Sequence, residues 1–390
     1  MALISPFQAK TEARWDAALQ SVVVRSLSKT WGEAAAVDNV SFAVEPGELL
    51  VLLGPSGCGK STTLRLIAGL DEPASGTIEI GGKDVRGLTG AARGVAMVFQ
   101  SYALLPHLTA ADNITFGLSV RGTPKPEMAR RLDKVAALLG LQPLLRRKPG
   151  QLSGGQQQRV ALGRALIAEA AVCLLDEPLS NLDAQLRQDL RREIRALQQR
   201  LGITMIYVTH DQTEAMSMAD RVILMRAGKV EQNGTPAELY QRPASLFVAR
   251  FIGGAPMNLL ELDDGPGGAV LAGSKGPLLL RGPGRGHVLG LRPEDVAVDS
   301  TAGPGRLHAR VTALEYLGAD ALVTCLAGER PIVARVRGAL APPVGAEVSL
   351  NWDAAAAHLF EAADGRRIAA GGGSTPRPVS LEKQQGRVVA

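Results

Sequence analysis

Residues 49–62 read LLVLLGPSGCGKST, an apolar run followed at once by a glycine-rich loop. The apolar run is typical of a buried central strand, and the residues after the loop continue as a helical segment. The loop matches the pattern G-x-x-x-x-G-K-[ST], in which backbone N–H groups turn inward around phosphate oxygens. A phosphate-binding loop is therefore predicted at Gly54, Pro55, Ser56, Gly57, Cys58, Gly59, Lys60, Ser61 and Thr62.

A second apolar run, residues 172–175, ends in Asp176 and Glu177. An aspartate at such a strand end holds Mg²⁺ directly or through water, and an adjacent carboxylate can polarise the attacking water. In the loop, Lys60 would reach the β- and γ-phosphate oxygens, and the hydroxyl of Ser61 would ligate Mg²⁺. Together the two strand ends predict hydrolysis of a nucleotide with Mg²⁺ as the cofactor.

Residues 152–156 read LSGGQ, a pentapeptide that resembles the signature motif of ATP-binding cassette (ABC) ATPases. Taken alone, its serine and glycines could equally form a polar turn before a helix over residues 156–168, and such a turn is itself an anion site. The other markers of this family stand in their usual order: Trp31, which would stack on adenine; Gln100 of the Q-loop; residues 180–183 of the D-loop; and His210, the switch histidine. Taken singly, Trp31 would more often be a core residue and His210 a hydrogen-bonded residue at a strand end.

The resemblance implies a homodimer in which two cassettes pair head to tail around ATP. Three residues of one subunit would close on the γ-phosphate held by the other, namely Ser153, Gly155 and Gln156. Glu177 would activate water, His210 would contact the γ-phosphate, and Gln100 would sense Mg²⁺ and water. The metal would lie among Ser61, Gln100 and Asp176. Because every member of the set is present, the chain is expected to be a competent ATPase.

Strand-like and helical segments alternate over residues 21–230, which predicts an α/β unit with a largely parallel sheet. The expected fold class is an α/β phosphate-loop ABC cassette with a helical subdomain, plus a C-terminal all-β, OB-like regulatory domain, since short β-like runs recur after residue 287. The expected divisions are an N-terminal extension at 1–20, the cassette at 21–252 with its helical subdomain at about 101–155, the β-barrel domain at 253–368, and a disordered tail at 369–390.

The composition is that of a soluble globular protein, with 390 residues, 46% hydrophobic, 21% charged and a formal net charge of +5. No run of eighteen apolar residues is present, so the sequence predicts no membrane span. Charges within residues 1–20 exclude a signal peptide. The basic residues are dispersed rather than clustered, which favours a solvated surface over a nucleic-acid partner. Three cysteines are too few for a disulfide framework, and a reducing compartment fits.

The C-terminal third resembles one group within the ABC family. The linker and regulatory β-barrel of carbohydrate-importer ATPases, the maltose type among them, are similar to residues 247–253, 256–258 and 290–295. Within that group, the ATPases of sn-glycerol-3-phosphate importers are the most similar at residues 314–320, 358–360 and 364–367. Importers of maltodextrin, other sugars, polyamines, sulfate and ferric ion use similar cassettes, and these solutes remain alternatives because the ATPase never touches the solute.

Such an ATPase would lie at the cytoplasmic face of the inner membrane as a peripheral subunit. Its partners would be two integral membrane permease subunits and a periplasmic solute-binding protein. The alternative of another class is a soluble ABC ATPase that acts on nucleic acid or ribosomes. The long coiled coil or second cassette of those proteins is missing from this sequence, so transport is favoured.

Cys58 lies inside the phosphate loop, next to a helix N-terminus and near Lys60. Both features lower the pKa of a thiol. A small filler residue is nevertheless the favoured role of Cys58, and alkylation of its thiol is still expected to inhibit by blocking ATP.

Overall fold

The computed structural model describes residues 20–274, 276–300, 306–368 and 377–379. The chain divides into two compact units between Ala237 and Glu238. The sequence placed the end of the cassette later, at residue 252. The domain limits given in the sequence analysis stay a prediction. The extension at 1–19 and most of the expected tail lie outside the described residues.

The first unit contains a six-stranded sheet in the order β10-β9-β3-β8-β7-β6. Its strands are β3 (Leu49–Leu53), β6 (Val95–Val98), β7 (Val172–Asp176), β8 (Thr204–Thr209), β9 (Arg221–Arg226) and β10 (Lys229–Gly234). All pairings are parallel except that of β9 with β10. Every residue of β3 and β8 is buried, as expected for parallel strands covered on both faces.

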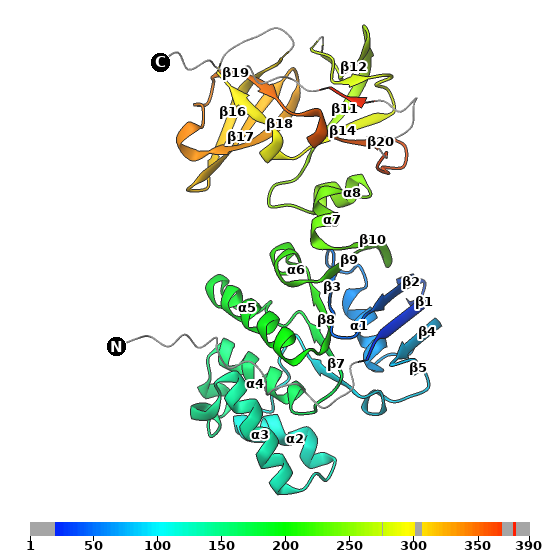
Figure 1. Cartoon of the computed structure of the whole chain (residues 1–390), viewed down its shortest axis with the longest axis vertical. Helices are drawn as coiled ribbons and strands as arrows, with labels where there is room; N and C mark the ends of the chain where they lie inside the picture. Colours follow the sequence, from blue (N-terminus) through cyan, green and yellow to red (C-terminus); the bar gives the residue numbers. More distant parts are fainter. Residues whose placement is uncertain (1–19, 275, 301–305, 369–376, 380–390) are drawn as a thin grey trace. The chain divides into compact units, whose positions relative to one another are not determined.

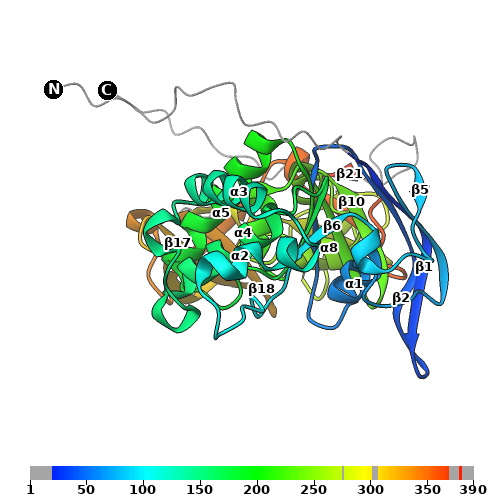
Figure 2. The ribbon, with the colours of Figure 1, turned by 90° about the horizontal axis from the view of Figure 1, so that it is seen from below.

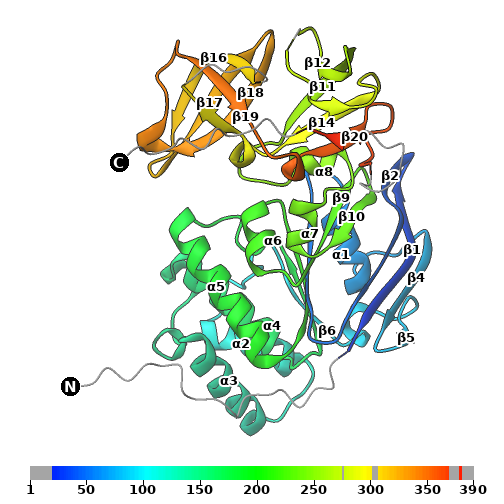
Figure 3. The same cartoon turned by 45° about the horizontal axis from the view of Figure 1, so that its top comes forward.

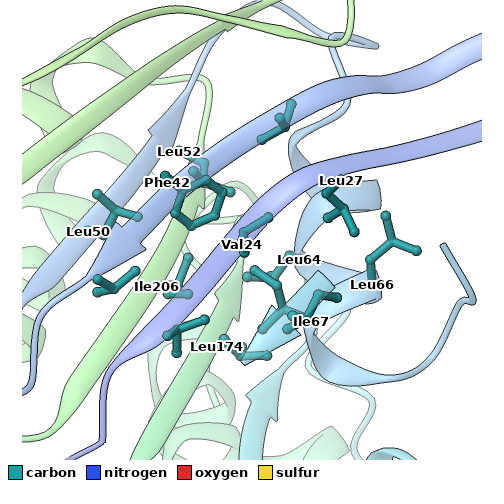
Figure 4. Packing of buried hydrophobic residues seen from close by; sticks show 14 of the residues in the cluster. Val24, Leu27, Phe42, Leu50, Leu52, Leu64, Leu66, Ile67, Leu174 and Ile206 are labelled. Atoms are coloured by element: carbon teal, nitrogen blue, oxygen red, sulfur yellow. The ribbon is translucent and has the colours of Figure 1, made fainter. Parts of the chain in front are cut away.

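A second, four-stranded antiparallel sheet in the order β2-β1-β4-β5 also belongs to this unit. Its strands are β1 (Val22–Trp31), β2 (Ala34–Val44), β4 (Ser75–Ile80) and β5 (Lys83–Asp84). The sequence did not predict it as a separate sheet. Helix α1 (Lys60–Ala68) packs between the two sheets (Figure 2). Figure 4 shows Leu64 and Ile67 of α1 meeting Val24 from one sheet and Leu174 and Ile206 from the other.

The expected helix-rich segment contains α2 (Ala110–Val120) and α3 (Lys125–Leu139), and α4 (Gly154–Leu166) follows. In Figure 1 these three helices gather at one end of the first unit. Helix α5 (Ala184–Leu201) ends at Gly202, whose φ of 69° is the left-handed conformation common at helix C-termini. The remaining helices are α6 (Gln212–Met218), α7 (Pro236–Gln241) and α8 (Leu246–Phe251).

The second unit contains two sheets, with strand orders β20-β14-β11-β12-β13-β21 and β15-β19-β16-β17-β18, and all of their described pairings are antiparallel. The first sheet has β11 (Asn258–Gly265), β12 (Gly268–Leu271), β13 (Leu280–Arg281), β14 (His287–Leu291), β20 (His358–Glu361) and β21 (Arg377–Pro378). The second has β15 (Ala297–Asp299), β16 (Leu307–Tyr316), β17 (Asp320–Ala327), β18 (Arg330–Arg337) and β19 (Glu347–Asn351). β21 falls in the segment expected to be a disordered tail, so that expectation does not hold for residues 377–378.

Arg292, just after β14, holds α7 and α8 within the second unit. Its guanidinium donates to the carbonyls of Tyr240, Ala249 and Ile252. It also lies 4.2 Å from the centre of the Tyr240 ring. The side chain is 2% exposed, and burial lowers the pKa of Arg292 to about 10. Backbone carbonyls of two short helices therefore rely on one buried guanidinium as their hydrogen-bond donor.

We expect Arg292→Met to destabilise the second unit by about 2–3 kcal/mol, because the buried carbonyls lose a charged donor and find no substitute. The buried Trp352 lies in this unit, so its fluorescence during urea unfolding measures the effect. Arg281→Met, at an exposed arginine of the same unit, is the control. Equal unfolding midpoints for the two variants would show that Arg292 has no such role.

Candidate functional site

Four neighbouring parallel strands bring the motif residues to one edge of the central sheet. Leu53 pairs with Thr209, Val208 with Asp176, and Leu175 with Val98. The carboxyl ends of β3, β8, β7 and β6 therefore lie side by side. The residues that follow these ends are the phosphate loop, His210, Glu177 and Gln100. Ligands of open α/β sheets bind at this kind of edge.

The phosphate loop requires glycine at two closely packed positions. A Cβ on Gly59 would lie 2.2 Å from the Ala36 carbonyl oxygen, and its φ is +101°. A Cβ on Gly54 would lie 2.4 Å from the Met225 carbonyl oxygen. Gly59 is also the N-cap of α1 and supplies no side-chain acceptor, so the first N–H groups of the helix remain free for an anion.

Lys60 is folded back over this loop. Its side chain is 4% exposed, and its Nζ donates to the carbonyl oxygens of Gly54 and Pro55, each at 2.9 Å. The ammonium group thus stands inside the ring of backbone groups that would surround a phosphate. Such a charge, held in a desolvated loop, interacts strongly with an anion.

Ser61 and Asp176 join the loop to β7. The Ser61 hydroxyl donates to Oδ1 of Asp176 at 2.7 Å. Burial raises the pKa of the Asp176 carboxyl, while the hydrogen bond from Ser61 opposes that rise. One carboxylate and one hydroxyl oxygen beside a phosphate loop fit Mg²⁺, which uses few protein ligands and completes its shell with water and substrate phosphates. The described residues contain no cluster of three or more His, Cys, Asp or Glu side chains that could hold a metal.

Glu177 and His210 form a pair next to this oxygen set. Oε2 of Glu177 lies 3.0 Å from Nδ1 of His210. The Glu177 backbone has a φ of 41°, an uncommon conformation for this residue type, and its N–H donates to the Val208 carbonyl at 3.1 Å. The pair therefore holds a carboxylate and an imidazole at the sheet edge, in a geometry suited to activating water.

Gln100 follows β6 at the same edge of the sheet. Within the described part of the chain, its side-chain amide makes no hydrogen bond. Its carbonyl accepts from the Asn181 side chain at 3.2 Å, which ties the Q-loop to the D-loop. The role of Gln100 toward Mg²⁺ and water stays a prediction.

Arg164 and Asn181 are connecting residues that the sequence analysis did not single out. The guanidinium of Arg164, on α4, donates to the carbonyls of Tyr102 and Ala103 at 2.6 and 2.5 Å. Both acceptors have positive φ, so the segment after Gln100 is held in a strained form by the signature helix. Asn181 could have been noticed as a polar residue within the D-loop motif, whereas nothing in the sequence around Arg164 indicates its distant partners.

The signature residues stand at the N-terminus of α4, where Ser153 is the N-cap. Its hydroxyl accepts from the Gln156 N–H at 3.4 Å, and the Gln156 side chain accepts from the Ser153 N–H at 3.0 Å. A Cβ on Gly155 would lie 2.8 Å from the Leu186 side chain, so this glycine allows α4 to approach α5 closely. The structure thus shows the motif as a helix cap, while its role as a γ-phosphate contact stays a prediction. Among the described residues, the side chains of Ser153 and Gln156 make no hydrogen bond to the phosphate loop.

Trp31 ends β1 and is 56% exposed, so the core role considered for it is wrong. The ammonium of Lys29 lies 4.6 Å from the centre of its ring. An exposed, cation-backed indole is available for stacking. Its role toward adenine stays a prediction.

The structure does not give Cys58 the lowered pKa that its neighbours in the sequence favour. The thiol is 3% exposed, and burial raises its pKa above the ordinary value although Lys60 acts in the opposite direction. Desolvation thus outweighs the nearby positive charge. The filler role fits this environment better.

We accordingly expect iodoacetamide to modify Cys58 far more slowly in the native, nucleotide-free protein than after unfolding in urea. Mass spectrometry of the peptide that contains Cys58 measures the rates. Cys173 and Cys325, which are also buried and free, are internal references. Rapid native labelling of Cys58 alone would restore the view of an activated thiol.

Comparisons with known proteins identify the family. A model of the ABC transporter domain matches residues 37–180, and a TOBE domain model matches residues 289–360. The sn-glycerol-3-phosphate import ATP-binding protein of Rhizobium meliloti is 48% identical over 355 residues, which cover 90% of this chain and 100% of the relative. This chain belongs to the ABC transporter ATP-binding proteins. A protein of the same name from Chromohalobacter salexigens is 50% identical over 85% of this ABC protein and 91% of the relative.

A solved dimeric bacterial ABC transporter cassette aligns with a TM-score of 0.50 at 31% identity, covering 55% of this ABC protein and 98% of the cassette. The predicted fold class is confirmed, with an α/β ABC cassette followed by an antiparallel, OB-like domain. The predicted ABC-type, ATP-binding ATPase is confirmed as well. Among the described residues, no helix has both the length and the apolar character needed to cross a membrane.

Proposed function

We propose that this ABC ATPase supplies the energy for uptake of sn-glycerol-3-phosphate. The observation that carries the proposal is the identity of 48% over the full length of an import ATP-binding protein of that name, including both the cassette and the TOBE region. The C-terminal segments that the sequence analysis found most similar to this group support the same solute. The site supports turnover rather than mere binding, because the Glu177–His210 pair stands beside the phosphate loop.

In the proposed reaction, the residues of one chain bind ATP and prepare water for attack. The loop N–H groups and Lys60 bind the phosphates and offset their growing negative charge. Ser61 and Asp176 would hold Mg²⁺, which supplies Lewis-acid stabilisation of the phosphates when bound. Glu177 accepts a proton from the attacking water, and His210 orients Glu177 through their 3.0 Å contact.

A second copy of the chain would complete the site. Ser153, Gly155 and Gln156 lie at a helix N-terminus, where free N–H groups and the helix dipole attract anions. Because these residues do not reach the loop of their own chain, we propose that they contact the γ-phosphate bound by a partner in a homodimer. The Ser153–Gln156 cap would open to release these groups.

The proposed partners are two permease subunits and a periplasmic solute-binding protein, with the ATPase at the cytoplasmic face of the inner membrane. Phe116 is 43% exposed and Val120 is 71% exposed, both on α2 near the segment that follows Gln100. Exposed apolar side chains of this kind suit a protein contact. Arg164 links that segment to α4, so movement of the signature helix would be passed to the permeases.

Transport in proteoliposomes tests the proposal. The ATPase is reconstituted with two permease subunits and the binding protein of an sn-glycerol-3-phosphate importer, and uptake of labelled sn-glycerol-3-phosphate is measured with and without internal ATP. We expect ATP-dependent uptake and none of maltodextrin, polyamine, sulfate or ferric ion. Uptake of one of those solutes instead would reject the proposed solute but keep the importer role, and copurification with ribosomes or DNA alone would reject both.

A further inference from the structure

His210 stands on a short turn between β8 and α6, and the residues on either side of it are tied to each other. Thr209, the last residue of β8, is 3% exposed, and its Oγ1 accepts from the N–H of Asp211 at 3.0 Å. Asp211 is the N-cap of α6, where its Oδ1 accepts from two N–H groups of the first turn. The His210 imidazole, whose Nδ1 lies 3.0 Å from Oε2 of Glu177, is therefore placed by whatever holds Asp211.

Two further contacts hold this turn. The first is buried: the hydroxyl of Tyr207 on β8 donates to Oε2 of Glu214 on α6 at 2.8 Å, and these residues are 0% and 3% exposed. The second is half-buried: Nη1 of Arg187, on α5, lies 3.6 Å from Oδ2 of Asp211. Figure 3 shows α5 and α6 side by side. Arg187 thus connects the turn to a helix beyond the strand and the helix that flank it.

Arg187 also contacts the D-loop. Its Nη2 donates to the carbonyl of Leu182 at 2.9 Å, while its Nη1 faces Asp211. The guanidinium is a rigid, planar fork, so the two contacts are held in a fixed relation. From the same D-loop, Asn181 donates to the carbonyl of Gln100. The segments that follow β6, β7 and β8 are therefore joined, and Arg187 joins the last two.

Stability alone explains the ion pair of Arg187 and Asp211 poorly. Ion pairs that remain partly exposed to water contribute little to the free energy of unfolding. Helix α6 already has its cap in Asp211 and its anchor in the hydrogen bond between Tyr207 and Glu214. The ion pair adds a fixed placement for the turn, whose imidazole is 54% exposed and is held by few neighbours.

We propose that Arg187 is a positioning residue for ATP hydrolysis, which holds the turn of His210 against the D-loop and so keeps the imidazole within reach of Glu177. Among the described residues, the hydrogen bond and the ion pair of the guanidinium go to Leu182 and Asp211, so its effect on the reaction passes through His210. The inference rests on the proposed role of His210 beside Glu177.

Steady-state ATP hydrolysis tests the proposal, with Arg187→Met and Asp211→Asn each made in the wild-type chain and in His210→Ala. In the wild-type chain we expect either change to lower kcat about tenfold or more and to leave the KM for ATP within about twofold, since a misplacement of about 1 Å can cost about 10²-fold in rate. In His210→Ala, itself impaired, neither change should lower kcat further, because the residue through which both act is gone. Arg187→Lys should keep part of the rate, since it retains a positive charge towards Asp211.

Asp211→Asn decides the test if Arg187→Met does not fold, because asparagine caps a helix as well as aspartate does. Arg200→Met, at an exposed arginine of the same helix, is the control and should keep the wild-type kcat. Equal losses of kcat in His210→Ala and in the wild-type chain, or a raised KM with kcat unchanged, would show a merely structural role and overturn the proposal. A wild-type kcat in both Arg187→Met and Asp211→Asn would overturn the positioning alone, whereas a wild-type kcat in His210→Ala would also reject the proposed role of the histidine.

Discussion

Glu177→Gln is expected to lower ATP hydrolysis by about 10²–10⁴-fold, the usual contribution of a general base. The amide cannot accept a proton from water, yet it has the size of the carboxylate and can keep a hydrogen bond to His210. Binding of ATP should survive, because Lys60 and the loop N–H groups are unchanged. ATP should then hold two chains together without being consumed, and a stable dimer should appear in size-exclusion chromatography with ATP and Mg²⁺.

The control for this experiment is Glu79→Gln, at a partly exposed glutamate on β4 in the same unit. This control variant should hydrolyse ATP at the wild-type rate. Its elution in size-exclusion chromatography should match that of the wild type under the same conditions. Hydrolysis by Glu177→Gln at the wild-type rate would show that another group activates water. Loss of hydrolysis without an ATP-dependent dimer would support Glu177 as the general base but contradict the proposed homodimer.

The site was predictable from the sequence because its residues follow apolar strands. Parallel strands buried on both faces read as continuous apolar runs, so Asp176 and His210 could be located at strand ends before the structure was known. Their proximity then follows from the parallel pairing of β7 with β8. The head-to-tail role of Ser153, by contrast, came only from the family resemblance, since nothing within one chain brings this residue to the phosphate loop.

The antiparallel sheet of the first unit was harder to predict. In β1 and β2 the pairing is interrupted by register shifts, and Ser26 and Asn39 have positive φ. Such irregularities break the two-residue alternation on which strand assignment relies. The two-residue strand β13 lies in a stretch dense in glycine and proline, so its sequence shows no alternation from which a strand could be assigned.

Roles that depend on burial were also beyond the sequence. Cys58 stands beside a cation and a helix N-terminus, which argues for a reactive thiol, but the fold leaves it 3% exposed. Arg164 looks like any basic residue near a helix end, and only the fold places the Tyr102 and Ala103 carbonyls against it. The local sequence shows which charges and helix ends lie near a residue. How far that residue is removed from water depends on residues that are distant in the sequence, and only the fold shows this.

Lys60→Met is expected to lower ATP hydrolysis by about 10²–10³-fold, the loss typical of removing one preorganised electrostatic donor from an active site. Methionine nearly matches the length of the lysine stem, so α1 should still fold. Two effects then combine. Bound phosphates would lose a buried positive charge, and the carbonyls of Gly54 and Pro55 lose the Lys60 ammonium as their hydrogen-bond donor.

Nucleotide titration separates these two effects. A fluorescent ATP analogue should bind Lys60→Met more weakly than the wild type, and the defect should be larger for ATP than for AMP, because the ammonium group is proposed to contact only the β- and γ-phosphates. Lys83→Met, at an exposed lysine on β5, is the control for loss of one positive charge and should match the wild type. Equal losses of affinity for ATP and AMP would mean that the loop itself had collapsed. Hydrolysis within tenfold of the wild-type rate would contradict the proposed placement of Lys60 against the transferred phosphate. Lys60 is 4% exposed, and among the described residues no other buried cation lies in the loop to replace its charge.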